Sequence, residues 1–247
     1  MPLADVFSLL VLGQGKSGLD VARWALAHPE RVSAVAVYGG GTSEPNDATR
    51  ALEAAGASFV YGTEQVEGAY DVCVTCPGIS EFSGFFKAGR EHAAQIMGEP
   101  EFAYRLSPDN WIAITGTNGK TTTTALLGDI LTQHAAREGK GRRVHVCGNI
   151  GSPVSLCAAE VKKGDDLVIE VSSYQLEDST YFRPHYACIL NVTPDHLDHH
   201  GGMKGYIKAK GKVFKNQRES DVLVVNGADT VCAELVEKAK SEVLAFS

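Results

Sequence analysis

The chain has 247 residues, a hydrophobic fraction of 44% and a formal net charge of -7 at pH 7. This length allows one large domain or two smaller ones with ample core. The acidic balance argues against a general nucleic-acid-binding surface, so an anionic nucleotide would need locally placed basic groups and helix N-termini. No apolar run is long enough to span a membrane, and the N-terminus lacks the pattern of a secretory signal.

The six cysteines are expected to be free thiols. Most of them lie in apolar segments, and none forms a metal-type pair with a matching second pair. Cys73 and Cys76 form a single C-x-x-C, but Pro77-Gly78 follows it instead of a helix start, which argues against a redox role. Free buried thiols indicate a reducing compartment, so we expect a cytoplasmic location.

A glycine-rich turn organises the first part of the chain. An apolar strand at 6–12 leads into residues 13–18, Gly-Gln-Gly-Lys-Ser-Gly, and a helical pattern follows at 19–27. This is a G-x-G-x-x-G motif between a strand and a helix, so Gly13, Gly15 and Gly18 are candidate contacts for a nucleotide or a diphosphate. The alternative is that the glycines only allow close packing of the helix on the strand.

A nicotinamide-type site would also need an acidic residue at the end of the second strand, predicted at 32–38. Three glycines stand there instead, which weakens that interpretation. A helix at 48–55 and strands at 58–61 and 70–75 are predicted next. The turn at Pro77 and Gly78 follows the last of these strands and is a second candidate ligand contact.

The segment 85–106 has a mixed pattern and is expected to be partly helical. A polar, proline-containing stretch at 107–110 then marks a candidate domain boundary. The sequence thus predicts a first domain at 1–107 and a second at 108–247.

A second glycine loop opens the second domain. Residues 111–115 read as a buried strand, and residues 125–131 have a helical pattern. The loop between them combines glycines with Lys-Thr, which is typical of a phosphate-binding loop at a helix N-terminus. Its two glycines are separated by two residues instead of the usual four, so a chance strand-turn-helix is the alternative. The candidate nucleotide contacts are Gly116, Thr117, Asn118, Gly119, Lys120, Thr121 and Thr122.

The four threonines after the loop lysine favour phosphate binding over a chance turn. Threonine is a poor helix former, and its hydroxyl is useful beside phosphate and metal. In such a loop Lys120 would reach the outer phosphates, and the hydroxyl of Thr121 would contact Mg²⁺.

Further strands are predicted at 144–147, 167–171, 187–192 and 221–225, with helices at 154–161, 206–216 and 231–240. This alternation predicts an α/β fold with mostly parallel sheets. Polar residues follow these strands, and the carboxyl ends of parallel strands share one edge, where ligands bind. We therefore expect the phosphate loop to meet Asn149, Glu170, His196 and Asn226 at one rim.

Two residues of this rim are candidate metal contacts. Glu170 ends an apolar strand, and a buried unpaired carboxylate is costly, so Mg²⁺ at the strand end would resolve the cost. A carboxylate that caps a neighbouring helix is the alternative. His196 is a candidate second metal contact or substrate contact, although Mg²⁺ prefers oxygen ligands. We expect His199 and His200 to be solvated loop side chains.

The basic helix at 206–216 presents two faces. At helical spacing Lys208, Lys212 and Lys215 share a face that is expected to be exposed to solvent. Lys210 lies on a different face.

Several of these motifs resemble the Mur ligases of bacterial cell-wall synthesis. Residues 116–122 resemble the ATP loop of that family, and the segments 148–151, 170–177 and 191–199 resemble in particular the branch of it that adds D-glutamate. The block Ser-Ser-Tyr-Gln-Leu-Glu at 172–177 is most similar to the branch that adds D-glutamate. The resemblance covers the whole chain and is specific from about residue 111 to residue 212. It implies a Rossmann-like domain for the UDP substrate, followed by a P-loop-containing central domain.

This resemblance implies an ATP-dependent amide ligase of peptidoglycan synthesis, a process that serves cell shape and division. ATP would phosphorylate the alanyl carboxylate of UDP-MurNAc-L-Ala, and the amine of D-glutamate would attack the acyl phosphate. Two Mg²⁺ ions would neutralise the phosphates. The partners would be these small molecules, and the protein would be a monomer.

The resemblance also implies roles for individual residues. Lys120 would hold the β- and γ-phosphates, and Thr121 with Glu170 would coordinate one Mg²⁺. His196 would serve a second Mg²⁺, together with Lys210 if that lysine is carbamylated. The implied substrate contacts are Gly13, Gly15, Gly18, Pro77, Gly78, Asn149, Ser172, Gln175 and His196.

The chain departs from the family in two respects. Cys76 stands where the family commonly has serine, which affects uridine recognition. The family also has a C-terminal domain that binds the amino acid. We therefore expect this chain to be part of a longer ligase, and we expect these 247 residues alone not to catalyse ligation. The alternatives are a paralogue that adds a different amino acid, a nucleotide-binding module without catalysis, and a dinucleotide oxidoreductase.

Overall fold

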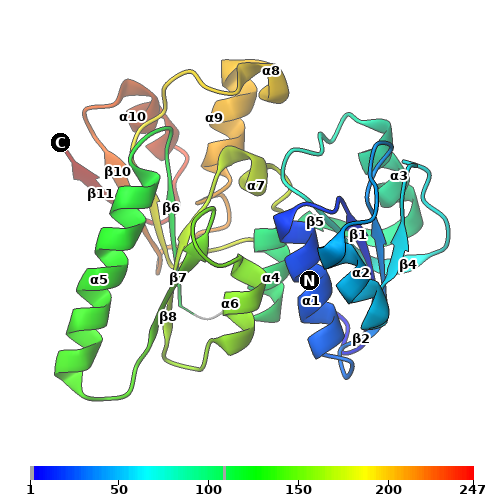
Figure 1. Ribbon diagram of the computed structural model, residues 1–247. Coiled ribbons are helices and arrows are strands. Elements are labelled where there is room, and N and C mark those ends of the chain that lie inside the picture. Colours follow the sequence, from blue (N-terminus) through cyan, green and yellow to red (C-terminus); the bar gives the residue numbers. More distant parts are fainter. Residues whose placement is uncertain (1–2, 108–109) are drawn as a thin grey trace. The chain divides into compact units, whose positions relative to one another are not determined.

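The computed structural model describes residues 3–107 and 110–247 of the chain (Figure 1). It contains two compact units, Met1–Arg105 and Leu106–Ser247. Residues 108 and 109 of the segment expected at the boundary lie outside the described residues. Strands and helices alternate in both units and every pair of neighbouring strands is parallel, which confirms the predicted fold class.

The first unit contains a five-stranded sheet in the order β3-β2-β1-β4-β5 within the described residues. The strand order reverses between β1 and β4, and open α/β sheets bind ligands at such a switch point. The elements are β1 (Phe7–Leu12), α1 (Lys16–Ala27), β2 (Val32–Tyr38), α2 (Asp47–Ala54), β3 (Ser58–Val60), β4 (Tyr70–Thr75), α3 (Gly84–His92), β5 (Ala93–Gly98) and α4 (Glu99–Leu106).

Strand β5 lies in the segment that was predicted to be partly helical. Its sequence, Ala-Ala-Gln-Ile-Met-Gly, has little β-propensity of its own. It pairs along its length with β4, and Met97 is buried against the sheet. Tertiary pairing therefore overrides a weak local preference at this position.

The second unit contains a six-stranded sheet in the order β11-β10-β9-β6-β8-β7 within the described residues. Helices α5 and α6 lie on opposite faces of it (Figure 1), as right-handed crossovers that run in opposite directions require. The elements are β6 (Trp111–Thr115), α5 (Lys120–Glu138), β7 (Val144–Gly148), α6 (Val154–Glu160), β8 (Asp166–Glu170), α7 (Ser173–Glu177), β9 (Tyr186–Ile189), α8 (Leu197–His200), α9 (Met203–Gly211), β10 (Val222–Asn226), α10 (Thr230–Val236) and β11 (Glu242–Phe246).

The sequence did not predict three short elements of this unit. Two of them are helices α7 and α8, which are too short to show a helical period. The third is strand β11, because the last predicted helix ends at Val236 instead of residue 240. Strand β11 follows that helix, pairs with β10 and is exposed along its whole length, so no alternating pattern marks it.

Among the described residues, no helix combines the length and the apolarity needed to cross a membrane.

The glycine turn after β1 shows which of its glycines serve packing. A Cβ atom at Gly18 would lie 2.2 Å from the carbonyl oxygen of Gly13 and 2.7 Å from Sγ of Cys76. Gly13 itself has a φ of +93°, which favours glycine. At Gly15, in contrast, a Cβ would meet nothing within 4 Å, so this position is open at the N-terminus of α1. Close packing explains Gly18 and the backbone conformation explains Gly13, so neither glycine requires a ligand.

This difference predicts unequal effects of two substitutions on the stability of the protein. Gly18→Ala should lower the free energy of unfolding by about 1–3 kcal/mol, because the added methyl group overpacks the turn. Gly15→Ser should change it by less than about 0.5 kcal/mol, because serine is a favoured N-cap residue and the space is free. Urea unfolding of both variants measures this, and equal stabilities would contradict the packing argument.

Candidate nucleotide and metal site

The loops that follow β6, β7, β8 and β9 lie at one edge of the second sheet, because all of these strands are parallel. The strand order reverses between β6 and β9. The glycine loop therefore starts at the switch point of the sheet, where ligands bind in open α/β folds.

The glycine loop leads directly into the first turn of α5. Gly116 and Gly119 have φ values of +156° and +81°, which place the chain in conformations that side chains disfavour. The Nζ atom of Lys120 donates to the carbonyl oxygen of Thr117 at 2.9 Å and so lies over the loop. The first N–H groups of an α-helix lack intrahelical acceptors, so the start of α5 offers donors to an anion.

The side chain of Asn191, from the loop after β9, holds the glycine loop in place. Its Oδ1 accepts hydrogen bonds from the backbone N–H groups of Thr117 at 3.1 Å and Asn118 at 2.8 Å. Its Nδ2 donates to the carbonyl oxygen of Asn118 at 3.0 Å. These two N–H groups are thus occupied by Asn191, so backbone donors for a phosphate would come from the residues that follow them.

The side chain of Thr117 joins the glycine loop to two further segments. Its Oγ1 accepts a hydrogen bond from the N–H of Thr193 at 3.0 Å and lies 3.0 Å from the hydroxyl of Tyr206 in α9. In this structure the Thr117 hydroxyl therefore serves the scaffold of the loop.

Glu170 ends β8 with a side chain that is buried among polar partners. The residue is 1% exposed. Its Oε2 accepts from Oγ1 of Thr121 at 2.7 Å, and its Oε1 accepts from Nδ2 of Asn149 at 2.9 Å. Gly148 lets the end of β7 lie close to the backbone of Glu170, because a Cβ at position 148 would lie 2.2 Å from the carbonyl oxygen of Glu170. The expected convergence of Thr121, Asn149 and Glu170 is present.

The donor set around Glu170 fits Mg²⁺. A carboxylate and a hydroxyl oxygen already lie within hydrogen-bonding distance, and Mg²⁺ takes oxygen ligands with several waters. The hydrogen bond from Thr121 also places the carboxylate at the N-terminus of α5. The same position therefore fits the alternative of a contact that caps a neighbouring helix.

Lys210 projects from α9 to the glycine loop. It is 1% exposed, and its Nζ donates to the carbonyl oxygen of Gly116 at 2.7 Å. Burial, followed by the nearby charge of Lys120, lowers the pKa of Lys210 from 10.5 to about 7, against the opposing charge of Asp195. A buried amine with a pKa near neutrality is a nucleophile in part, which a solvent-exposed lysine is not.

The other lysines of this helix follow the prediction in part. Lys208 and Lys215 are exposed, as expected from their shared face. Lys212 is half-buried and donates to the carbonyl oxygen of Glu177, so the expectation of full exposure was wrong for this residue. Contact between α9 and α7 explains the difference.

His196 lies on the loop after β9 and has an unusual backbone conformation. Its φ is +50°, and it precedes α8 directly. Its Nε2 is 3.3 Å from Oδ2 of Asp195, and its ring lies 5.0 Å from the ring of Tyr174. Its side chain is half-exposed. A backbone in the left-handed region costs a non-glycine residue free energy, so the surrounding structure must hold His196 in this conformation.

Ser172 and Gln175 form a capping box at the start of α7. The Oγ of Ser172 accepts from the backbone N–H of Gln175 at 3.2 Å, and Oε1 of Gln175 accepts from the N–H of Ser172 at 3.0 Å. Their polar groups thus satisfy each other and fix α7 next to Glu170. A substrate contact by these two side chains stays a prediction.

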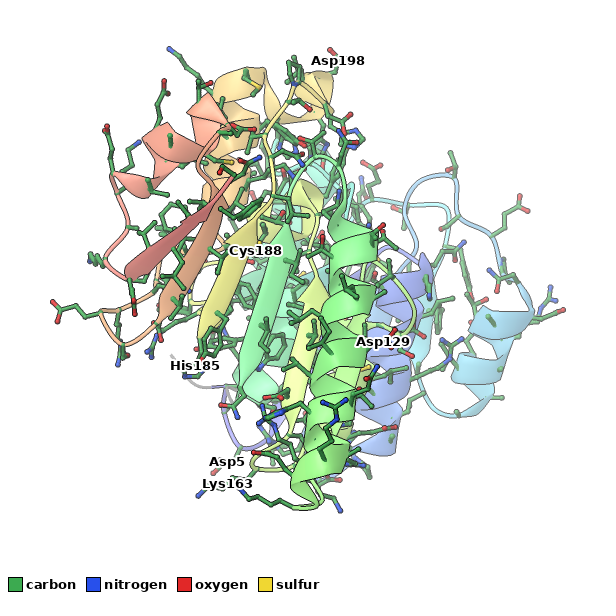
Figure 2. All side chains as sticks on the ribbon, turned by 90° about the vertical axis from the view of Figure 1, so that its left-hand side faces the viewer. Asp5, Asp129, Lys163, His185, Cys188 and Asp198 are labelled. Atoms are coloured by element: carbon green, nitrogen blue, oxygen red, sulfur yellow. The ribbon has the colours of Figure 1, made fainter. Side chains whose placement is uncertain are left out.

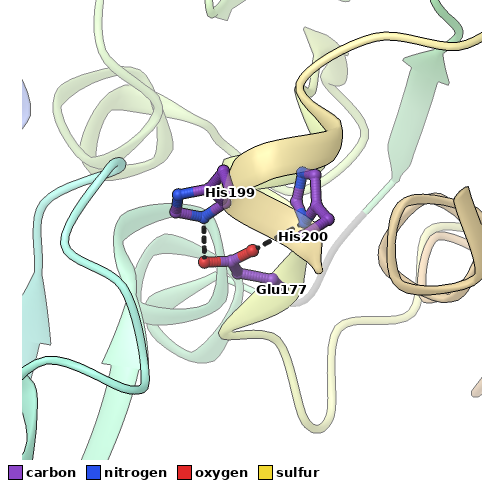
Figure 3. A group of neighbouring side chains, drawn as sticks. All are labelled: Glu177, His199 and His200. Atoms are coloured by element: carbon purple, nitrogen blue, oxygen red, sulfur yellow. Dashed lines mark hydrogen bonds and ion pairs between the residues drawn. The ribbon is translucent and has the colours of Figure 1, made fainter. Parts of the chain in front are cut away.

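His199 and His200 are not solvated loop side chains, so that expectation was wrong. The Nε2 of His199 is 2.7 Å from Oε1 of Glu177, and the Nδ1 of His200 is 3.0 Å from Oε2 (Figure 3). Burial, reinforced by His199 and His196, lowers the pKa of His200 from 6.5 to about 4. The sequence placed Glu177 at the end of a recognised block but offered no local pattern that joins it to the histidines.

The first unit places its candidate residues at its own switch point. The thiol of Cys76, which follows β4, donates to the carbonyl oxygen of Gly13 after β1 at 3.4 Å. Burial raises the pKa of the Cys76 thiol to about 11, so it stays protonated. Gly78 has a φ of +96°. The two candidate turns are therefore neighbours at the edge where a diphosphate would bind.

Two residues of the site region were missed or given no role by the sequence analysis. Asn191 lies inside a recognised block, but nothing in the sequence shows that it clamps the glycine loop. Asp229 accepts from the N–H of Val192 at 3.0 Å and the N–H of Cys232 at 3.0 Å. Burial raises the pKa of the Asp229 carboxyl, but these hydrogen bonds outweigh it and lower the pKa overall.

The clamp predicts a specific effect of Asn191→Ala. The N–H of Asn118 would lose its side-chain acceptor, and a lost hydrogen bond costs about 0.5–1.5 kcal/mol. The N–H of Thr117 would keep a second acceptor, the backbone carbonyl oxygen of Asn191 at 3.0 Å. We expect amide hydrogen exchange at Asn118 to accelerate by up to about tenfold, since roughly 1.4 kcal/mol corresponds to that factor, and exchange at Thr117 to change less. Asn226→Ala is the control, because among the described residues Oδ1 of Asn226 accepts from the N–H of Ala228, within its own turn and outside the glycine loop. Equal exchange in both variants would contradict the clamp.

Comparisons with known proteins agree with the predicted family. Residues 114–247 match the family model of the Mur ligase middle domain. The UDP-N-acetylmuramoylalanine–D-glutamate ligase of Elusimicrobium minutum is 41% identical over 240 residues, which cover 96% of this chain and 52% of that enzyme. The enzyme of the same name from Caldanaerobacter subterraneus is 46% identical over 177 residues, which cover 72% of this chain and 38% of that enzyme.

A solved structure supports the same fold. The UDP-N-acetylmuramate:L-alanyl-gamma-D-glutamyl-meso-diaminopimelate ligase from Neisseria meningitides superimposes with a TM-score of 0.59, covering 98% of this chain and 78% of that chain. The sequence identity is 17%, so this likeness shows the fold alone. The present chain spans about half or less of the length of the curated relatives it matches. Because the family model covers more than half of its residues, the chain belongs to the Mur ligase family.

Proposed function

We propose that this chain is the substrate- and nucleotide-binding part of UDP-N-acetylmuramoyl-L-alanine:D-glutamate ligase, MurD. The observation that carries the proposal is the meeting of Thr121 and Glu170 beside a glycine loop at the switch point of the sheet. The choice of D-glutamate rests on the relatives, which bear the name of that ligase and match up to 98% of this chain.

The glycine loop and the start of α5 would bind the phosphates of ATP. Lys120 would exchange its contact with the Thr117 carbonyl for the outer phosphates, because an ammonium group prefers an anion to a neutral carbonyl. The free N–H groups of the first turn of α5 would face the same phosphates. The remaining proposed loop contacts are Gly116, Thr117, Asn118, Gly119, Thr121 and Thr122.

Thr121 and Glu170 would hold one Mg²⁺, and His196 and a modified Lys210 would contribute to a second. Bound Mg²⁺ supplies charge neutralisation for phosphoryl transfer. Asn149 holds Oε1 of Glu170 and thus orients the carboxylate. The alanyl carboxylate of UDP-MurNAc-L-Ala attacks the γ-phosphorus, ADP leaves, and the amine of D-glutamate then displaces phosphate to form the amide.

Lys210 would become a carbamate. Its neutral amine would add to CO₂ and release a proton, which converts a cation into an anion next to the loop. The low pKa of Lys210 provides the neutral amine near pH 7. An anion at this place would also remove the repulsion between Lys210 and Lys120.

The first unit would bind the uridine nucleotide of the substrate at Gly13, Gly15, Gly18 and the Pro77-Gly78 turn. Residues 1–107 would form this domain, and residues 108–247 the ATP-binding domain. The protein would act in the cytoplasm as a monomer, and the described cysteines, all free thiols, are consistent with a reducing compartment. Its reaction would support the cell wall and, through it, cell shape and division.

Calorimetric titration tests the proposal. The protein should bind UDP-MurNAc-L-Ala, and separately Mg²⁺ with a non-hydrolysable ATP analogue. Lys120→Ala should weaken nucleotide binding at least tenfold, because a charge-assisted hydrogen bond contributes about 1.5–3 kcal/mol. Lys204→Ala, which removes an exposed lysine of α9, should bind as the wild type does. Nucleotide binding that is unaffected by Lys120→Ala would contradict the loop assignment.

Carbamylation of Lys210 is tested by ¹³C NMR in bicarbonate enriched in ¹³C. We expect a carbamate carbon signal that grows as the pH rises through about 7, because the amine becomes neutral in that range. The signal should be absent from Lys210→Arg and present in Lys208→Arg. A signal that survives in Lys210→Arg would show that another amine carries the modification.

A further inference from the structure

Three side chains outside the proposed nucleotide site converge on one point (Figure 3). Glu177 is the last residue of α7, and His199 and His200 are the last two residues of α8. The Glu177 carboxylate lies between the two rings, with Oε1 2.7 Å from Nε2 of His199 and Oε2 3.0 Å from Nδ1 of His200. The three candidate ligand atoms lie within 4.8 Å of one another.

The convergence takes place in a largely buried setting. The side chains of Glu177 and His199 are each 14% exposed, and that of His200 is 3% exposed. Burying a carboxylate costs free energy, and a cation shared by the three groups would lower that cost.

Ser173 orients the ring of His200 from behind. Its Oγ is 2.9 Å from Nε2 of His200. A serine hydroxyl can accept as well as donate, so it can hold the tautomer in which Nε2 carries the proton. In that tautomer the lone pair of Nδ1 faces Oε2 of Glu177, 3.0 Å away, so a cation could bind to both atoms. Hydrogen bonds of this kind on the far nitrogen are typical of histidines that ligate metals.

We propose that Glu177, His199 and His200 form a binding site for a transition-metal ion of the Zn²⁺ class. Two imidazole nitrogens and one carboxylate oxygen are a donor set that Zn²⁺ uses, with water in the fourth position. Mg²⁺ prefers oxygen ligands, so this donor set discriminates against it. The site shares no side chain with the proposed Mg²⁺ site of Thr121 and Glu170.

Metal in this site would join the end of α7 to α8. The atoms need only a small adjustment, because tetrahedral ligands with bonds of 2.0–2.1 Å are about 3.4 Å apart. Helix α8 begins directly after His196, and the ring of Tyr174 in α7 lies 5.0 Å from the His196 ring and 4.2 Å from that of His199. The ion would therefore fix the segment that carries His196.

Titration of the metal-stripped protein with Zn²⁺, in the presence of excess Mg²⁺, tests the site. We expect one equivalent of Zn²⁺ to bind. His199→Gln should lower the affinity at least tenfold, whereas His134→Gln should leave it unchanged. The pair of His134 and Glu138 is a matched control, because these side chains are 3.6 Å apart, are more exposed than those of the proposed site, and have no third candidate ligand among the described residues. Absence of stoichiometric binding, or equal binding by His199→Gln, would overturn the proposal.

Two further measurements apply even if His199→Gln does not fold. Ser173→Ala should weaken Zn²⁺ binding by about tenfold or more, the usual effect of removing a partner behind a metal-binding histidine. The Co²⁺-substituted wild type should show the visible absorption of nitrogen and oxygen ligation. A sulfur-to-cobalt charge-transfer band would place the ion on a cysteine and overturn the proposal, as would unchanged affinity in Ser173→Ala.

Discussion

A carboxylate at the end of a buried strand needs polar partners, and much of the candidate site follows from how this chain satisfies Glu170. All five residues of β8 are buried, so the carboxylate cannot reach solvent as an exposed side chain would. Thr121 and Asn149 approach it from the ends of the neighbouring segments and each donate one hydrogen bond. The oxygens of Glu170 and Thr121 become ligands if a hard cation takes the place of the threonine proton. The contacts that lower the cost of burying Glu170 are therefore also those that a metal ion needs.

The glycine loop depends on a second set of constraints from the opposite side of the switch point. Asn191 occupies two of its N–H groups, and Lys210 donates to its first carbonyl group. The loop is thus held by β9 and α9 before any ligand arrives, which limits the entropy that binding must remove. A nucleotide would bind to a preformed loop that is flanked by the buried Lys210, the half-buried Lys120 and the N–H donors at the start of α5.

The sequence was sufficient for the parts of this account that depend on local pattern. Apolar runs located most of the strands, and glycine, lysine and threonine in the loop after β6 identified the candidate phosphate-binding loop. The parallel topology then explains why Glu170 and Asn149 meet Thr121, since parallel strands bring their carboxyl ends together. Contacts between short elements could not be predicted, because α7 and α8 have no period to detect. The group of Glu177, His199 and His200 is of this kind, as is the clamp by Asn191.

The most direct test of the central claim is a crystal structure of the protein with Mg²⁺ and a non-hydrolysable ATP analogue. The account predicts that the 2.7 Å hydrogen bond between Thr121 and Glu170 is replaced by one Mg²⁺ bound to both side chains. The phosphates should lie against the start of α5, with Lys120 moved from the Thr117 carbonyl to the outer phosphates. A nucleotide bound elsewhere, or bound here with the hydrogen bond between Thr121 and Glu170 intact, would contradict it.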